Sequence, residues 1–174
     1  MAHELLNIPS RISFYWTMTE LFNADSMRTL FKAENKATDE GKSLLDALAL
    51  TEDESDTIYV QILSDGVYDV FLRFLKYTTG ITDAIKFNKS YTPTGGVAAN
   101  SVVLQIVNND NYNANYLDAV DMTLEKCIRY YFLREWFMLK DLDNDAKKAD
   151  YQYQNNLNNL LRHSVELKKA SISF

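Results

Sequence analysis

The chain has 174 residues, of which only five are glycine and two are proline. This excludes collagen-like, linker-like and turn-dense all-β chains, because such chains are rich in one or both residues. The net charge of −6 argues against a protein whose own field draws it onto nucleic acid or anionic lipid. Since 47% of the residues are hydrophobic, a core can form, and we predict one mainly helical domain over residues 1–174.

Neither secretion nor membrane insertion is indicated by the sequence. The N-terminal residues lack a basic segment followed by an apolar run, and no stretch reaches the roughly 18 uncharged apolar residues of a membrane span. The single cysteine, Cys127, cannot form an internal disulfide. We therefore expect a soluble protein of a reducing compartment.

The first predicted element is a helix over residues 9–36. Its stripe recurs at steps of three and four, as one face of a helix requires, and Pro9 suits a first helical turn. The stripe consists of Ile12, Tyr15, Trp16, Thr19, Phe22, Met27, Leu30 and Phe31. Residues 23–26 could divide this helix into two. Core packing is the expected role of Trp16, with an interface as the alternative.

A second helix is predicted from residue 51 to Gly80. Thr51 and Glu54 match a capping box, and the acidic residues around them complement the positive end of a helix dipole. Gly66 lies inside this helix at a cost of up to about 1 kcal/mol relative to Ala.

A β-hairpin is predicted over residues 83–107, inserted in the helical bundle. Apolar residues alternate with polar ones in two runs, typical of strands, and Pro93, Gly95 and Gly96 lie between the runs. The loop between the two runs has about nine residues and is longer than usual, and residues 83–107 carry a slight positive charge. Docking on an acidic partner, another copy of this chain included, is one interpretation; a loop without a partner is the other.

Two further helices complete an antiparallel bundle of about four. The third follows Asn113 or Asn115 as N-cap and is apolar over most of its girth, so we expect it at the centre. The fourth is capped by acidic residues at 143–145, and the short link makes the two an αα-hairpin. Residues 170–174 alternate like a strand and could pair with a neighbour's sheet edge.

The candidate chemical motifs are incomplete. Residues 141–145 place acids as a calcium loop does, but Ala146 replaces the required Gly and Gln152 the bidentate Glu. We interpret Cys127 as a buried thiol, and the pair Glu125 and Arg129 as a solvated helix-face pair. No catalytic residue, cofactor or metal site is therefore predicted, and we do not expect an enzyme.

Four segments carry a resemblance to a known family. They are Phe14-Tyr15-Trp16, residues 44–51, residues 130–137 and the basic helical stretch at 157–169. Their order resembles that of the neck-ring, or head–tail connector, proteins of tailed bacteriophages, in particular crAss-like and related phages of Bacteroidetes.

The resemblance implies a non-enzymatic virion protein that assembles in the host cytoplasm into a ring, of twelve copies, between portal and tail. Its partners would be itself, the portal and other neck or tail proteins, with DNA only passing through the lumen. A ring needs two different surface patches on each copy. The candidate interface residues are Lys86, Lys89, Tyr91, Gly95 and Gly96 in the hairpin and Ile172 and Phe174 in the tail. The alternative is a stand-alone cytoplasmic helical bundle acting as a binding or regulatory module.

Overall fold

The computed structural model describes residues 6–8, 11–36, 58–75, 85–88, 101–107 and 114–168. The helices of these residues are α1 (Met18–Lys36), α4 (Val60–Leu75), α5 (Leu117–Leu139) and α6 (Asp143–Lys168). The strands are β1 (Leu6–Ile8), β2 (Arg11–Thr17), β3 (Ile85–Asn88) and β4 (Ser101–Val107). A 3₁₀ turn, η2 (Ala114–Tyr116), leads into α5. The part of the chain that the structure describes is mainly helical, as predicted, and none of its helices is long and apolar enough to cross a membrane.

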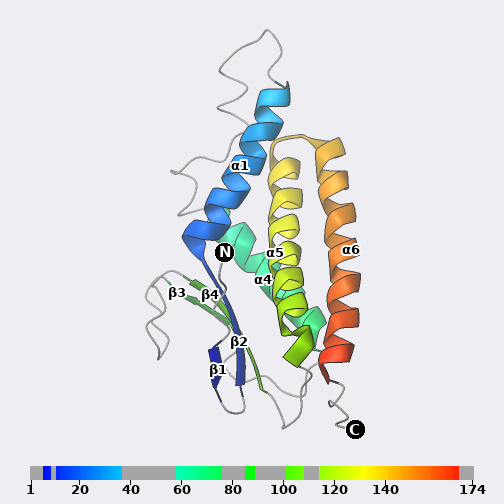
Figure 1. Ribbon diagram of the computed structural model, residues 1–174. Coiled ribbons are helices and arrows are strands. Elements are labelled where there is room, and N and C mark those ends of the chain that lie inside the picture. The colour runs from blue at the N-terminus through cyan, green and yellow to red at the C-terminus, as the bar shows by residue number, and fades with distance from the viewer. Residues whose placement is uncertain are drawn as a thin grey trace.

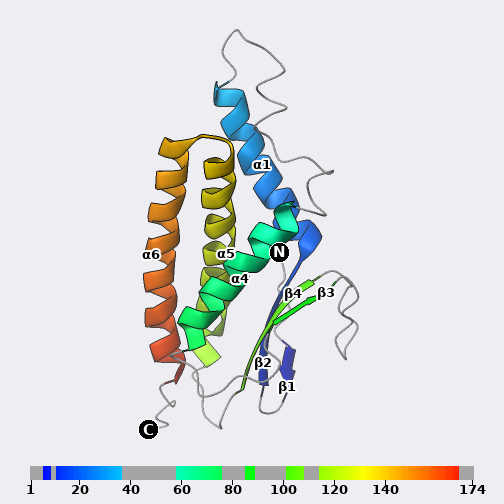
Figure 2. The same cartoon turned by 180° about the vertical axis from the view of Figure 1, so that it is seen from behind.

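Helix α5 is the central element of the helical layer, as its wide apolar surface predicts. In Figures 1 and 2, α6 runs antiparallel beside it, α4 crosses it, and α1 lies on the side away from α6. Leu124, Phe132 and Trp136 of α5 are fully buried, so this helix supplies much of the core. The αα-hairpin formed by α5 and α6 is present, and a turn over residues 140–142 joins its two helices.

The prediction that a helix begins near Pro9 is wrong. Residues 11–17 form strand β2, and the helix begins only at Met18, from where it continues through residues 23–26 without a break. Trp16 fits a helical stripe, but Phe14 and Trp16 also fit a two-residue period, and both are buried. The strand forms because β4, some 90 residues later, supplies its hydrogen-bond partners. A local pattern cannot reveal such a partner.

The four strands form one antiparallel sheet in the order β1-β2-β4-β3. Two rows of paired residues across β2, β4 and β3 are apolar throughout: Phe14–Leu104–Ile85 and Trp16–Val102–Phe87. In Figure 1 this sheet lies beside the lower end of the helical layer. Phe14 and Trp16 belong to the same core cluster as the helices, so the sheet and the helices share one core.

The strands expected for an inserted hairpin are therefore part of a larger sheet. β3 pairs antiparallel with β4, but β4 also pairs with β2 along all seven of its residues. These strands are thus not an isolated insertion in a helical bundle. The residues of the expected loop between the two strands, 92–100, lie outside the described residues.

Helix boundaries agree with the predictions only in part. The N-cap of α5 is Tyr116, without a side-chain capping bond, and Asn115 lies in η2, so the predicted Asn cap is wrong. Acidic residues do occupy the first turn of α6, at Asp143 and Asp145. The capping box at 51–54 and the predicted stop at Gly80 lie outside the described residues.

Helices α4 and α5 are in close contact at Gly66. A Cβ atom placed on this glycine would lie 2.7 Å from Cδ1 of the Tyr131 ring, far inside van der Waals contact. Gly66 is buried and Tyr131 half-buried. A residue that the sequence shows only as a weak helix former is therefore the one that lets α4 lie against α5.

We predict that Gly66→Ala lowers the free energy of unfolding by about 1–3 kcal/mol, because the added methyl group displaces the Tyr131 ring. Helix propensity alone predicts a gain of up to about 1 kcal/mol. Urea unfolding measures the difference. In a Tyr131→Ala background the same substitution should lose its cost, and an equal cost in both backgrounds would contradict the contact.

Candidate functional site

A buried ionic cluster joins α1, the start of α4 and α5. The carboxylate of Asp25 is fully buried and accepts a hydrogen bond of 3.0 Å from Nε of Arg129 on α5. Its other oxygen accepts one of 3.3 Å from the hydroxyl of Tyr59. Arg129 also donates from Nη1 to Glu125, one turn earlier in α5, over 3.1 Å. One guanidinium therefore holds two carboxylates, one fully buried and one at the edge of the core.

Burial dominates the electrostatics of this cluster. Removal from water raises the pKa of Asp25 from 3.8 to about 6, although Arg129, Arg28 and the Tyr59 hydroxyl oppose the rise. Burial and the neighbouring Asp25 carboxylate also raise the pKa of Tyr59, so its hydroxyl stays a hydrogen-bond donor at neutral pH. The guanidinium of Arg28 lies 5.1 Å from the ring centroid of Tyr130 and adds a second positive charge near Asp25.

The interpretation of Glu125 and Arg129 as a solvated pair is wrong. Their side chains are only 15% and 11% exposed, and Arg129 is shared with Asp25, 104 residues earlier in the chain. The spacing of four residues is common on helix surfaces, so only the approach of α1 distinguishes this pair from a solvated one.

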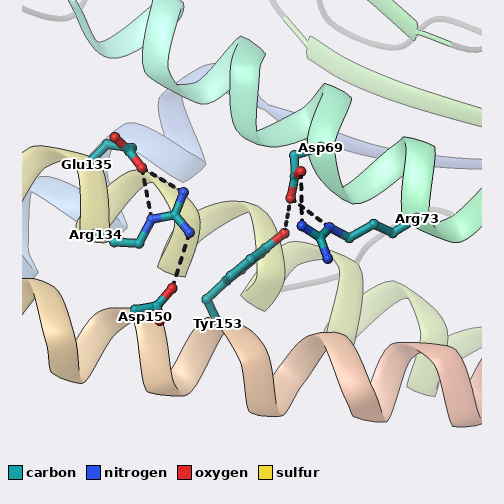
Figure 3. Close-up of polar contacts among 6 residues, drawn as sticks. All are labelled: Asp69, Arg73, Arg134, Glu135, Asp150 and Tyr153. Carbon is teal, nitrogen blue, oxygen red and sulfur yellow. Dashed lines mark hydrogen bonds and ion pairs between the residues drawn. The ribbon is translucent and has the colours of Figure 1, made fainter.

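A second polar cluster links α4, α5 and α6 near the surface (Figure 3). Asp69 on α4 accepts hydrogen bonds from the Tyr153 hydroxyl on α6 and from Nε of Arg73, the latter over 3.1 Å. Arg134 on α5 donates to Glu135 over 2.8 Å and to Asp150 of α6 over 3.2 Å. Burial and the bond to Asp69 raise the pKa of Tyr153 above its usual value, which keeps this phenol a donor.

Aromatic rings hold Arg134 in place between α5 and α6. Its guanidinium carbon lies 4.4 Å from the ring centroid of Tyr131 and 5.3 Å from that of Tyr153, while these two rings meet edge to face at 5.7 Å. The Tyr131 ring also lies against Gly66, in space that a larger side chain at residue 66 would need. In the two clusters Asp25, Asp69 and Asp150 bond to arginine or tyrosine side chains of neighbouring segments, an arrangement that fixes helix packing and orientation.

Several predicted candidates lie in the core or at a turn. Trp16, Trp136 and Cys127 are buried, and burial raises the pKa of the Cys127 thiol to about 12, as suits the predicted unreactive cysteine. Of residues 141–145, the first two lie in the turn before α6, where Asp141 has a left-handed backbone with φ of 55°, and the other three begin α6. Among the described residues, no three His, Cys, Asp or Glu side chains are placed to hold a metal ion.

Of the seven predicted interface residues, the structure describes one. Lys86 lies in the edge strand β3, where it is paired with Val103. The others lie outside the described residues: Lys89, Tyr91, Gly95, Gly96, Ile172 and Phe174.

The structure exposes apolar residues that the sequence pattern assigns to the core. Met27 and Leu30 on α1 were expected in its buried stripe, yet they are 57% and 39% exposed. The side of α1 that packs on the core carries Leu21, Asp25 and Thr29 instead. Two polar residues on the buried face account for the error, because they conceal its apolar period.

Two further surface features were not predicted from the sequence. Met138 and Leu139, adjacent at the end of α5, are about half exposed. Near the other end of the αα-hairpin is an open hollow of about 500 Å³. It is lined by Tyr116, Asn159, Arg162, His163, Val165 and Glu166. The spacing of residues 159, 162, 163 and 166 was a usable signal for one helix face, but the contribution of Tyr116 from η2 depends on the fold.

Comparison of the chain with protein-family models, curated proteins and solved structures found no match.

We predict that Asp25→Asn changes the pH dependence of stability. Because folding raises the pKa of Asp25 from 3.8 to about 6, the folded state holds this proton more tightly than the unfolded state. The stabilising contribution is thus complete below the lower value and is lost as pH rises through the upper one, by at most about 1.4 kcal/mol per pH unit. The variant should lack this loss, and urea unfolding from pH 4 to 7 measures it.

Tyr59→Phe is the matched control for that measurement. It removes a hydrogen bond to Asp25 but keeps the carboxylate, so it should lower stability while preserving the decline with pH. Parallel stability curves for the wild type and Asp25→Asn would contradict the raised pKa.

Tyr153→Phe should lower the free energy of unfolding by about 1 kcal/mol, because the half-buried Asp69 carboxylate loses the hydrogen bond from a buried hydroxyl. Tyr68→Phe, at an exposed position on α4, is the control and should change stability by less than about 0.5 kcal/mol. Equal effects of the two substitutions in urea unfolding at pH 7 would show that the bond to Asp69 contributes nothing.

Proposed function

We propose that this protein is a non-enzymatic structural subunit that assembles with copies of itself into a ring in the neck of a tailed bacteriophage, between portal and tail. The proposal combines the resemblance of the segment order with the surface of the folded chain. Portal and other neck or tail proteins would be its further partners, and the virion its final location.

The observation that carries the proposal is that exposed apolar side chains come in neighbouring pairs. Met27 and Leu30 on α1 are three residues apart, and Tyr68 and Leu72 on α4 are four apart, so each pair shares one helix face. Single exposed apolar residues are ordinary, whereas grouped ones are typical of interaction sites. A cyclic assembly needs two different patches on each copy, and these pairs lie on different helices.

The two polar clusters are consistent with a structural role. They use arginine, tyrosine and carboxylate side chains to tie four segments of the helical layer together, in and beside the core. The negative charge of the chain would keep DNA from adhering to the wall of a channel.

Lys86, Lys89, Tyr91, Gly95 and Gly96 are proposed as part of one contact between copies in the ring. The segment 89–100 connects the edge strand β3 to β4, and an edge strand presents unpaired backbone groups to a neighbour. We propose the edge of the sheet at β3, with the segment that follows it, and the tail at 170–174 as two contact elements of the ring.

The mass of the purified chain in solution, by light scattering and by electron microscopy of stained particles, tests the proposal. We expect a closed ring of uniform copy number, alone or with neck partners, and the protein in purified virions. A chain lacking residues 92–100 should keep its helical circular dichroism and lose assembly. A monomer at every concentration, absent from virions, would instead favour the stand-alone binding or regulatory module.

A further inference from the structure

Two surface features lie at opposite ends of the αα-hairpin. The first, which we term the tip, consists of Met138, Leu139, Asp141 and Asp143, all exposed. The second is the hollow described above, which is lined by Tyr116 and by residues 159–166 of α6, Val165 among them. In Figure 1 the turn between α5 and α6 is at the top, and the C-terminal end of α6 is at the bottom.

The tip combines apolar and acidic groups in one turn. Met138 and Leu139 are 49% and 60% exposed, so two large apolar side chains project next to each other at the end of α5. Asp141 and Asp143 follow directly, and the left-handed backbone at Asp141 makes the turn tight. Lys140 lies between the apolar and the acidic residues, with its Nζ 4.4 Å from the ring centroid of Trp136. The tip therefore exposes two apolar side chains beside two carboxylates.

The hollow has the complementary character. Its volume of about 500 Å³ lies in the range of the pockets in which proteins bind other molecules. Val165 and the Tyr116 ring supply apolar surface, and Tyr116 and His163 lie with ring centroids 6.3 Å apart. Glu166 adds one carboxylate, while Arg162, His163, Asn159 and Tyr116 offer hydrogen-bond donors to an acidic partner.

The tip and the hollow of one molecule cannot meet. Asp143 of the tip begins α6 and residues 159–166 of α6 line the hollow, so at 1.5 Å of rise per residue the two features lie about 24–35 Å apart. A contact between them must therefore join two copies, and it uses different surfaces on each copy. Such a head-to-tail contact propagates from copy to copy and closes into a ring when the rotation per copy permits.

We infer that the tip of one copy docks into the hollow of the next, with Leu139 and Met138 against Val165 and Tyr116, and Asp141 or Asp143 beside Arg162. This contact rests on the self-assembly proposed above and names one pair of surfaces for it. The occupant of the hollow is thus a second copy of this chain.

Disulfide trapping tests the contact directly. Leu139→Cys and Val165→Cys are prepared separately, mixed and oxidised, and the native Cys127 does not interfere because it is buried. We expect a linked dimer from the mixture but none from either variant alone. The control replaces Val165→Cys with Gln154→Cys, an exposed position of α6 outside the hollow, and should give no link. One chain carrying both Leu139→Cys and Val165→Cys should give a ladder of linked copies.

Light scattering of Leu139→Glu separates this contact from assembly as such. Loss of the oligomer, with helical circular dichroism retained and Gln154→Glu still assembled, supports the contact. An oligomer that persists in Leu139→Glu, together with no trapped dimer, overturns the contact and leaves the proposed self-assembly standing. A wild-type chain that is monomeric at every concentration, with no trapped dimer, overturns both.

Discussion

The ion pair between Asp25 and Arg129 is the interaction on which the rest of the helical layer depends. A fully buried carboxylate is costly unless a cation and hydrogen-bond donors surround it. Here the cation comes from α5 and a donor from Tyr59, just before α4. The cost of burying Asp25 is therefore offset only when α1, α5 and the segment before α4 pack against one another. Apolar contact is nondirectional, so we interpret this cluster as the group that selects how α1 lies on α5.

Packing on the other side of α5 follows from a small residue. Gly66 lets α4 approach until the Tyr131 ring fills the space that a side chain would occupy. The same ring supports the guanidinium of Arg134, which bonds to Asp150 on α6. One glycine is thus connected through one aromatic ring to the contact between α5 and α6. The central helix is held by directional contacts on both sides as well as by its apolar core.

These contacts have a consequence for how the surface could serve an assembly. Because α5 and α6 lie side by side as an antiparallel pair, the two ends of their hairpin lie at opposite ends of the helical layer. A rigid subunit with unlike ends can join its neighbours by one repeated contact. In the proposed ring, the grouped exposed side chains of α1 and α4 would supply further contact surfaces between copies.

The sequence by itself determined the elements whose signals are local. The scarcity of glycine and proline predicted a mainly helical chain. Apolar residues around most of the circumference of α5 predicted it as the central helix, and acidic residues predicted the start of α6. Only the tertiary structure decided that residues 11–17 are a strand, that Met27 is exposed and that Arg129 is buried. The strand depends on β4 and the buried arginine on Asp25, partners far along the chain about which a local pattern carries no information. Met27 is exposed because Asp25 and Thr29 lie on the buried face of α1 in its place.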